Sequence, residues 1–156
     1  MRIRILAIGT RVPRWAQEAC AEYLQRLQAA FQIELIEIAA GKRSPGIDPS
    51  RAIQRESTQL ARHLRPADHV VALDERGREL TTRTLASWLG ARRSQGSDVA
   101  LLIGGPDGLT PEIRARSHET LSLSRLTLPH ALARVVLIEQ LYRAHSILAG
   151  HPYHRD

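Results

Sequence analysis

The stretch LLIGGPDGLT, Leu101 to Thr110, joins an apolar run to a loop that contains three glycines. The apolar run belongs to DVALLIGG (98–105), whose short length and aliphatic side chains predict a buried strand. Thr110, Pro111 and Glu112 then supply an N-cap, a proline for the first helical position and an acid for the first turn. The stretch therefore predicts a strand, a tight connection and a helix, which is the repeating unit of an α/β fold.

The same order of elements recurs along the chain. Strands are expected at 3–9, 31–38, 69–74, 98–105 and 120–128, and the segment ERGRE (75–79) is expected to form a turn. Helices are expected at about 12–31, 49–64 and 131–148, with two more beginning at Thr81 or Thr82 and at Thr110. This alternation predicts one α/β domain over residues 1–156, with a mainly parallel sheet of five or six strands and helices on both faces.

Basic residues outnumber acidic ones in this chain of 156 residues. Lysine and arginine total 22 against 16 aspartates and glutamates, which gives a net charge of +6. Residues 1–65 carry 11 basic and 6 acidic side chains, a net charge of +5, whereas the remainder carries 11 and 10. Such a balance suits a polyanionic partner such as nucleic acid, although a solvated arginine surface gives the same composition.

Cys20 is the single cysteine, which excludes an internal disulfide and fits a reducing compartment. It falls on the apolar face of the first expected helix, so we expect a core residue rather than a reactive thiol. The N-terminus lacks the apolar segment of a signal peptide, and no run of about 20 apolar residues is present. We therefore expect a cytoplasmic protein with no membrane partner.

Three loops are expected at the carboxyl ends of strands, after Leu73, Ile103 and Leu128. Ligands of open α/β sheets bind at this edge. Gly104 and Gly105 in the second loop permit either a tight turn or the close approach of a ligand to the backbone. The loop has neither the Lys-Ser/Thr pair of a P-loop nor the spacing of a GxGxxG fingerprint, which disfavours a nucleotide-dependent enzyme.

The C-terminal part of the chain carries histidines and a long apolar helix. His130, His151 and His154 do not predict a metal site, because the first lies twenty-one residues before the others and no thiolate joins them. The helix expected at 131–148 is apolar nearly all round, which indicates burial within the domain or against a partner helix. In a domain this small the partner helix is favoured, so a homodimer is expected.

A resemblance to a known family follows from three segments, LLIGGPDGLT, LSRLTLPHALARVVLIEQLYRAHSI and the terminal HPYHR. Together they resemble the methyltransferase H family of 23S rRNA pseudouridine N3-methyltransferases, in the SPOUT superfamily. The segments AIGT, EYLQRL, IELIEIAAGKR and VALDERG match this family too, so the resemblance covers essentially the whole chain.

The resemblance implies a SPOUT fold with a C-terminal trefoil knot and a cytoplasmic homodimer that associates through the last helix. It also implies a reaction in which S-adenosylmethionine donates a methyl group and leaves as S-adenosylhomocysteine. The implied acceptor is N3 of the pseudouridine at position 1915, in helix 69 of 23S rRNA in the assembled ribosome. The rival interpretations are a non-catalytic RNA-binding module and a related methyltransferase that acts on tRNA.

The resemblance also assigns residues to the site. The implied cofactor contacts are Leu73, Gly104, Gly105, Leu123, Ser124, Arg125, Leu126, Thr127 and Leu128. The implied catalytic residues are His130, Arg134, Tyr153, His154 and Arg155.

Each implied catalytic residue has a hypothetical role. His130 follows the cofactor loop directly, and Arg134 stabilises an anionic base. Tyr153 stacks on the target base or orients it, His154 accepts the proton, and Arg155 holds a phosphate or the anionic ring. His130 as a simple helix cap and Arg134 as a surface residue are the alternatives.

Two basic residues outside this set are also candidates for RNA binding. Lys42 and Arg43 follow a turn-rich AAG segment. They either contact rRNA phosphates or belong to a solvated loop.

Overall fold

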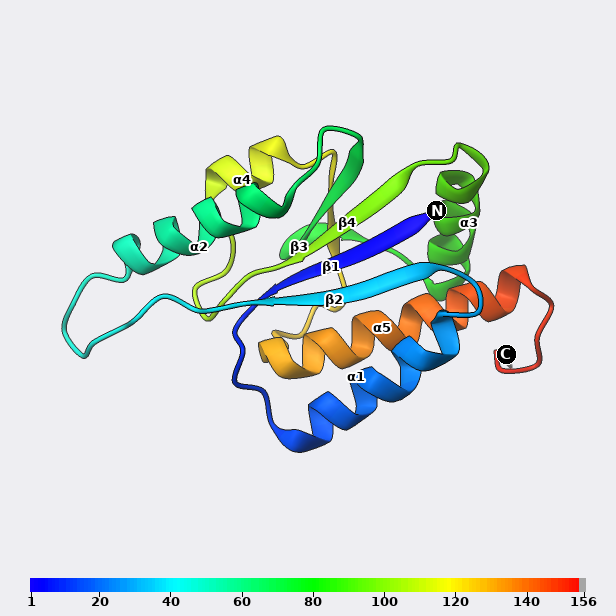
Figure 1. Cartoon of the computed structure of the whole chain (residues 1–156), viewed down its shortest axis with the longest axis horizontal. Helices are drawn as coiled ribbons and strands as arrows, with labels where there is room; N and C mark the ends of the chain where they lie inside the picture. Colours follow the sequence, from blue (N-terminus) through cyan, green and yellow to red (C-terminus); the bar gives the residue numbers. More distant parts are fainter. Residues whose placement is uncertain (155–156) are drawn as a thin grey trace.

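The computed structural model describes residues 1–154, in which strands and helices alternate from end to end (Figure 1). The strands are β1 (Arg2–Ile8), β2 (Gln32–Ile38), β3 (Asp68–Glu79), β4 (Asp98–Ile103) and β5 (Glu119–Ser122). The helices are α1 (Arg14–Leu27), α2 (Ser50–His63), α3 (Thr82–Ser94), α4 (Pro111–Arg116) and α5 (His130–Leu148). The predicted α/β class is therefore confirmed.

The five strands form one sheet in the order β2-β1-β4-β3-β5, and every neighbouring pair is parallel. Each connection between parallel strands crosses over through a helix, as this geometry requires. All five strands consequently end at the same edge of the sheet, and the loops that follow them are gathered there.

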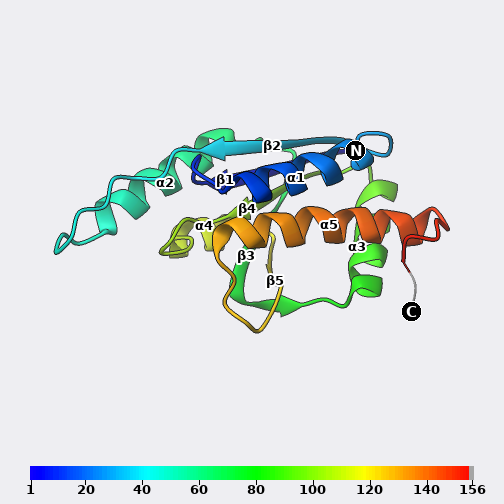
Figure 2. The same cartoon turned by 90° about the horizontal axis from the view of Figure 1, so that it is seen from below.

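Helices cover both faces of the sheet. Helices α1, α3 and α5 lie on one face and α2 and α4 on the other, as Figures 1 and 2 show. Alternate residues of a strand point to opposite faces, so Ile5 and Leu101 join the first core while Leu6 and Leu102 join the second. Burial on both sides explains why β1 and β4 are continuously apolar.

Two expectations about the strands are wrong. The segment ERGRE is not a turn, because β3 continues to Glu79, with a shift in register against β5 between Leu73 and Arg78. Gly77 makes this pairing possible, since a Cβ there would lie 2.5 Å from the backbone carbon of Leu121.

The strand expected at 120–128 is shorter than predicted, because β5 stops at Ser122. The Ser122 hydroxyl donates to the carbonyl oxygen of Ser124 (2.9 Å), and the Ser124 hydroxyl accepts from the backbone N–H of Leu126 (2.9 Å). These side chains satisfy backbone groups that would otherwise pair in the sheet. Residues 123–129 are therefore a loop.

The expected helix starts are confirmed. Thr81 caps α3 by accepting from the N–H of Thr84, and Thr110 caps α4 by accepting from the N–H of Ile113, with Pro111 in the first position. Cys20 is buried in the core, as predicted. None of the helices formed by residues 1–154 is both long and apolar enough to cross a bilayer.

Helix α5 is packed largely within its own chain. Leu137, Ile138 and Leu141 are buried in the core that α5 shares with α1 and α3. The ring of His145 meets the edge of Phe31, with centroids 5.3 Å apart. Much of the apolar surface that favoured a partner helix is thus covered inside the domain, and association through α5 stays a prediction.

Candidate active site

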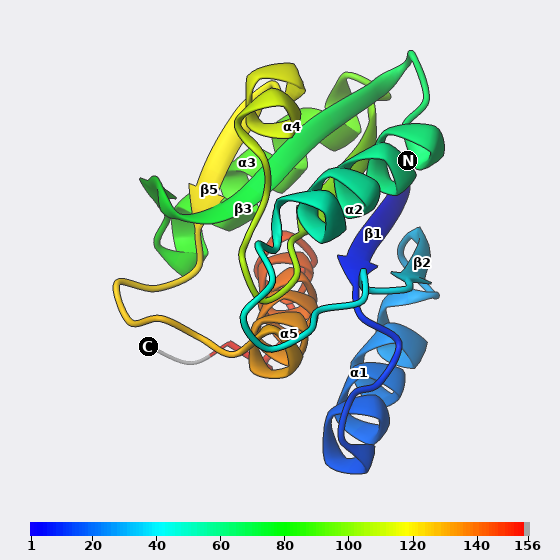
Figure 3. The same ribbon diagram turned by 90° about the vertical axis from the view of Figure 1, so that its left-hand side faces the viewer.

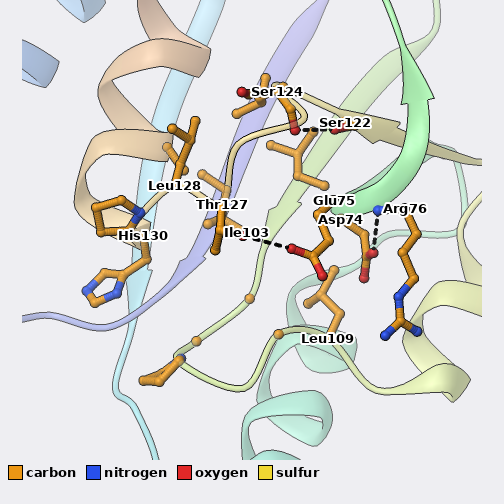
Figure 4. A pocket seen from close by; sticks show the side chains of 18 of the residues that line it. Asp74, Glu75, Arg76, Ile103, Leu109, Ser122, Ser124, Thr127, Leu128 and His130 are labelled. Atoms are coloured by element: carbon orange, nitrogen blue, oxygen red, sulfur yellow. Dashed lines mark hydrogen bonds between the residues drawn. The ribbon is translucent and has the colours of Figure 1, made fainter.

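A cavity of about 890 Å³ lies at the carboxyl ends of β4 and β5, beside the middle of β3 (Figure 4). Its volume is in the range of small-molecule sites. Residues 73–76 of β3, the loops after β4 and β5, and the start of α5 form most of its wall. The lining residues are Leu73, Asp74, Glu75, Arg76, Ile103, Gly104, Gly105, Pro106, Asp107, Gly108, Leu109, Arg114, Ser122, Leu123, Ser124, Leu126, Thr127, Leu128, Pro129, His130 and Ala133.

The cavity brings together eight of the nine residues that the sequence suggested as cofactor contacts. The exception is Arg125, whose side chain is 88% exposed and pairs with Glu79 outside the lining. Sequence reasoning missed the residues that directly follow the apolar part of β3, namely Asp74, Glu75 and Arg76. Their position directly after an apolar run could have identified them as site residues. They were overlooked because the segment 75–79 was expected to form only a turn.

The glycines of the loop after β4 are required by the packing of the protein itself. A Cβ at Gly104 would lie 2.6 Å from the backbone carbon of Gly108, and a Cβ at Gly105 would lie 2.9 Å from the Ile8 side chain and 3.0 Å from Glu56. Gly108 has a φ of +76°, which favours glycine. The structure thus shows the tight turn, and the close approach of a cofactor remains a prediction.

Polar contacts hold the cavity walls to one another. The Asp74 carboxylate accepts from the Arg114 guanidinium (3.1 Å) and from the backbone N–H of Arg76 (3.0 Å). The Thr127 hydroxyl donates to Glu75 (3.2 Å), which joins the loop before α5 to β3 (Figure 4). The cavity lining therefore combines aliphatic side chains with carboxylates, hydroxyls and the imidazole of His130.

His130 lines the cavity from the first residue of α5 and is half-buried. The N-cap of this helix is Pro129, and no side chain makes a capping hydrogen bond, so the interpretation of His130 as a helix cap is wrong. Gly9, at φ +107°, lies beside it, because a Cβ there would be 3.7 Å from Nε2 of His130. Because Gly9 has no side chain, the end of β1 leaves room for the imidazole of His130.

Arg134 is one helical turn further along α5 but does not line this cavity. Only 1% of it is exposed, so the alternative of a surface residue is wrong. Its guanidinium donates to the carbonyl oxygens of Ile8 (2.8 Å) and Gly9 (2.6 Å) and to the Glu37 carboxylate (2.7 Å). In this arrangement Arg134 fixes α5, and with it His130, against the ends of β1 and β2.

A comparison with protein-family models decides the identity of the chain. The model described as a predicted SPOUT methyltransferase matches residues 1–154. The chain belongs to the SPOUT methyltransferase family.

Several similar proteins carry the name ribosomal RNA large subunit methyltransferase H. The one from Chromohalobacter salexigens is 50% identical over 155 residues, which cover 99% of this chain and 100% of the relative. Those from Laribacter hongkongensis (100% of both chains) and Pseudomonas aeruginosa (99% and 100%) are 47% and 44% identical. Within the SPOUT methyltransferases, the chain thus belongs to the methyltransferase H family.

The fold is also similar to a solved SPOUT-like structure of low sequence identity. The tRNA (m1G37) methyltransferase from Aquifex aeolicus matches with a TM-score of 0.55 and 12% identity, over 92% of this chain and 70% of that one. At this identity the likeness concerns the fold alone.

The C-terminal tail of this SPOUT methyltransferase lies far from its own cavity. Helix α5 has 19 residues and is about 28 Å long at 1.5 Å per residue. His130 is at its start, whereas Tyr153 and His154 follow its end (Figure 2). Arg155 lies outside the described residues. The chain by itself therefore does not bring the suggested catalytic residues together.

Tyr153 is held at that far end by contacts within the chain. Its hydroxyl lies 3.1 Å from the Glu139 carboxylate and 3.2 Å from the Tyr23 hydroxyl. Burial, together with hydrogen bonds to Tyr23 and Glu139, raises the pKa of Tyr153 above its ordinary value. Tyr153 is thus a protonated phenol at neutral pH, suited to donate a hydrogen bond or to stack.

The three histidines considered as a metal site, His130, His151 and His154, do not lie close together. Helix α5 separates His130 from His151 and His154. Across the described part of the chain, no group of three or more histidine, cysteine, aspartate or glutamate side chains is placed to hold a metal ion.

Proposed function

We propose that this chain transfers a methyl group from S-adenosylmethionine to N3 of a pseudouridine in 23S rRNA. The acceptor is the residue at position 1915, in helix 69 of the assembled ribosome, and the work is done in the cytoplasm. One observation carries this proposal: three of the segments that resemble the family, VALDERG, LLIGGPDGLT and the beginning of LSRLTLPHALARVVLIEQLYRAHSI, form the walls of a single cavity. The name of the full-length relatives supports the choice of substrate.

The cavity fits S-adenosylmethionine in size and chemistry. Its aliphatic wall, which includes Leu73, Ile103 and Leu128, suits the adenine ring. Carboxylates in its lining suit the positive charges of the ligand. Asp74 is paired with Arg114, while the charge of Glu75 meets only the Thr127 hydroxyl and stays available. When bound, the cofactor supplies an electrophilic methyl group on a sulfonium.

The chain's own residues must position the target base and remove a proton. N3 of pseudouridine carries a proton at neutral pH, so a base is needed before the nitrogen attacks. His130 is the imidazole at the cavity wall, and a neutral ring nitrogen there accepts that proton. Arg134 acts through His130, because it fixes the first turn of α5 from behind.

In a homodimer, the C-terminal tail of one copy can contribute to the reaction in the cavity of the other copy. Tyr153 and His154 lie about one helix length from the cavity of their own chain. A second copy, packed so that its α5 runs in the opposite direction, brings its tail to the first copy's cavity. Tyr153 then stacks on the base or donates to it, and Arg155 contacts phosphate. The trefoil knot of the family stays a prediction for the loops at the cavity.

The test uses purified protein, labelled S-adenosylmethionine and ribosomes that lack this modification. We expect one methyl group per ribosome, mapped by mass spectrometry to the pseudouridine in helix 69. Cofactor binding without transfer to ribosomes would move the substrate to tRNA or another RNA. The absence of both binding and transfer would leave an RNA-binding module.

A further inference from the structure

The exposed face of α2 carries a stripe of three arginines, Arg51, Arg55 and Arg62. Their spacing of four and seven residues puts them on one side of the helix. The opposite side is buried, with Ala52, Glu56, Ser57 and Leu60 against the sheet. Within residues 1–154, no hydrogen bond or ion pair involves any of the three guanidinium groups. We call these three residues the arginine face.

No carboxylate on the helix offsets this charge. Glu56 is the only acid of α2, and it is 3% exposed and paired with Arg43. The first turn contains no acid, yet it contains Arg51, where the positive end of the helix dipole disfavours a cation. Helix stability alone does not account for three unpaired cations placed in this way.

Helix α2, which carries the arginine face on its solvent side, is joined through its buried side to one wall of the candidate active site. The Ser57 hydroxyl lies 2.8 Å from the hydroxyl of Thr110, which ends the glycine loop. Arg43 donates to Glu56 (2.6 Å) and to Asp107 of the cavity wall (2.7 Å), and so joins α2 to that loop. Figure 3 shows α2 beside the connection between β4 and α4. Helix α2 and the glycine loop of the cavity wall therefore form one connected part of the structure.

We propose that the arginine face binds the phosphate backbone of the RNA substrate, outside the nucleotide that enters the cavity. The stripe covers about 16 Å along the helix, from Arg51 to Arg62 at 1.5 Å per residue, which is long enough for several successive phosphates. Arginine suits this task because its planar guanidinium binds phosphate oxygens in pairs. Such contacts set orientation and affinity without reading sequence. This inference rests on the proposed function.

The two basic residues of the preceding loop, Lys42 and Arg43, differ in whether their charge is already paired within the protein. Lys42 is exposed in the loop before α2. Arg43 is committed to Glu56 and Asp107 inside the protein. Of the two loop residues suggested by the sequence, we thus expect only Lys42 to be available to RNA.

The test replaces all three arginines by glutamine, which keeps a similar helix propensity. Binding of full-length protein to ribosomes is measured by co-sedimentation at several salt concentrations. We expect the Kd to rise roughly tenfold at 0.15 M salt, and the log–log salt slope to fall by about 2, because each lost phosphate contact removes about 0.7. The single variant Arg55→Gln should remove about one third of this slope change.

The matched control removes the same charge from other elements, with Arg2→Gln on β1, Arg93→Gln on α3 and Arg116→Gln on α4. We expect it to bind ribosomes with a Kd within about twofold of the wild type and with little change in slope. Equal losses in both triple variants would overturn the inference, since net charge alone would then explain binding. An unchanged Kd and slope in the α2 variant would overturn it as well.

Methyl transfer is measured separately, so that the two proposals can fail independently. Wild-type protein that methylates ribosomes, with an α2 variant of unchanged Kd and KM, contradicts only the arginine face. Wild-type protein that binds ribosomes through the arginine face but transfers no methyl group contradicts only the proposed reaction. Absence of any ribosome binding by the wild type overturns this inference.

Discussion

The guanidinium of Arg134 on α5 lies 2.7 Å from the carboxylate of Glu37 on β2. Arg134 is buried, whereas 37% of the Glu37 side chain is exposed. Two backbone carbonyls at the end of β1 accept further hydrogen bonds from Nη2 of the guanidinium. The pair therefore joins the last helix to the two strands whose ends lie beside His130.

Replacing Arg134 by methionine should lower the free energy of unfolding by about 3 kcal/mol, because Glu37 and two carbonyls lose their partner. Methyl transfer should fall with stability, since His130 loses its support. Urea denaturation and kcat are measured on the same samples, with Glu37→Gln as a milder control because Glu37 is partly solvated. Full stability with no methyl transfer would instead favour a direct role for Arg134 at the base.

Gly104→Ala should destabilise the loop after β4 by about 1–3 kcal/mol and weaken the binding of S-adenosylmethionine. The new Cβ meets the backbone of Gly108 at 2.6 Å, and backbone moves less easily than a side chain. Gly90→Ala on α3 is the control, because its nearest neighbour is the flexible end of Leu148. Calorimetric binding and thermal unfolding of both variants check this, and equal stability of the two would contradict it.

His130→Asn should lower kcat for methyl transfer by roughly 100-fold or more if His130 is the general base. The Kd for S-adenosylmethionine should stay within about threefold, because the cavity wall is otherwise intact. His63→Asn, an exposed histidine at the end of α2, should have kcat near that of the wild type. A His130 variant with normal kcat would assign proton removal to another group.

Mixed dimers test the proposed exchange of tails. His130→Asn and Tyr153→Ala are each expected to be nearly inactive as pure proteins. Mixing them after subunit exchange should restore activity, because one cavity of the mixed dimer then has both a normal His130 and a normal Tyr153 from the other copy. Persistent inactivity after verified exchange would mean that each tail serves its own chain, or that the tail does not act.

Glu119 should stabilise the protein at neutral pH and lose this effect in acid. Burial raises its pKa, but hydrogen bonds from Trp88 (2.8 Å), His69 (2.7 Å) and Arg78 (3.0 Å), together with the charge of His69, outweigh burial and leave the pKa below its ordinary value of 4.5. A depressed pKa means stabilisation that is complete above pH 4.5 and fades as the pH falls below it.

Glu119→Gln should therefore cost about 1–2 kcal/mol at pH 7 and progressively less below pH 4.5. Urea denaturation between pH 7 and pH 3.5 measures the difference between variant and wild type. The control Glu22→Gln removes an exposed partner of Arg26 and should change little at any pH. A difference that is constant with pH would contradict the assignment of the effect to ionisation.

The sequence predicted much of the cavity, because its signals are local. An apolar strand that stops at glycines, and a threonine and proline that start a helix, depend on residues within one or two turns of one another. Parallel strands end at one edge, so the residues after Leu73, Ile103 and Ser122 were bound to meet. The local pattern gave a wrong prediction where contacts with residues distant in the sequence decide the structure. At Gly77 the backbone of Leu121 in β5 packs closely, so a segment that was expected to be a turn is part of β3.

The sequence by itself determined the α/β class, the two capped helices and the family of this SPOUT methyltransferase, because periodicity, capping and motif order are properties of neighbouring residues. The tertiary structure alone decided that Arg134 is buried and that Tyr153 lies a helix length from His130. It also decided that the arginines of α2 face solvent while the opposite side of this helix contacts Thr110 of the glycine loop. These relations depend on which elements pack together, and packing is set by contacts between residues far apart in the chain.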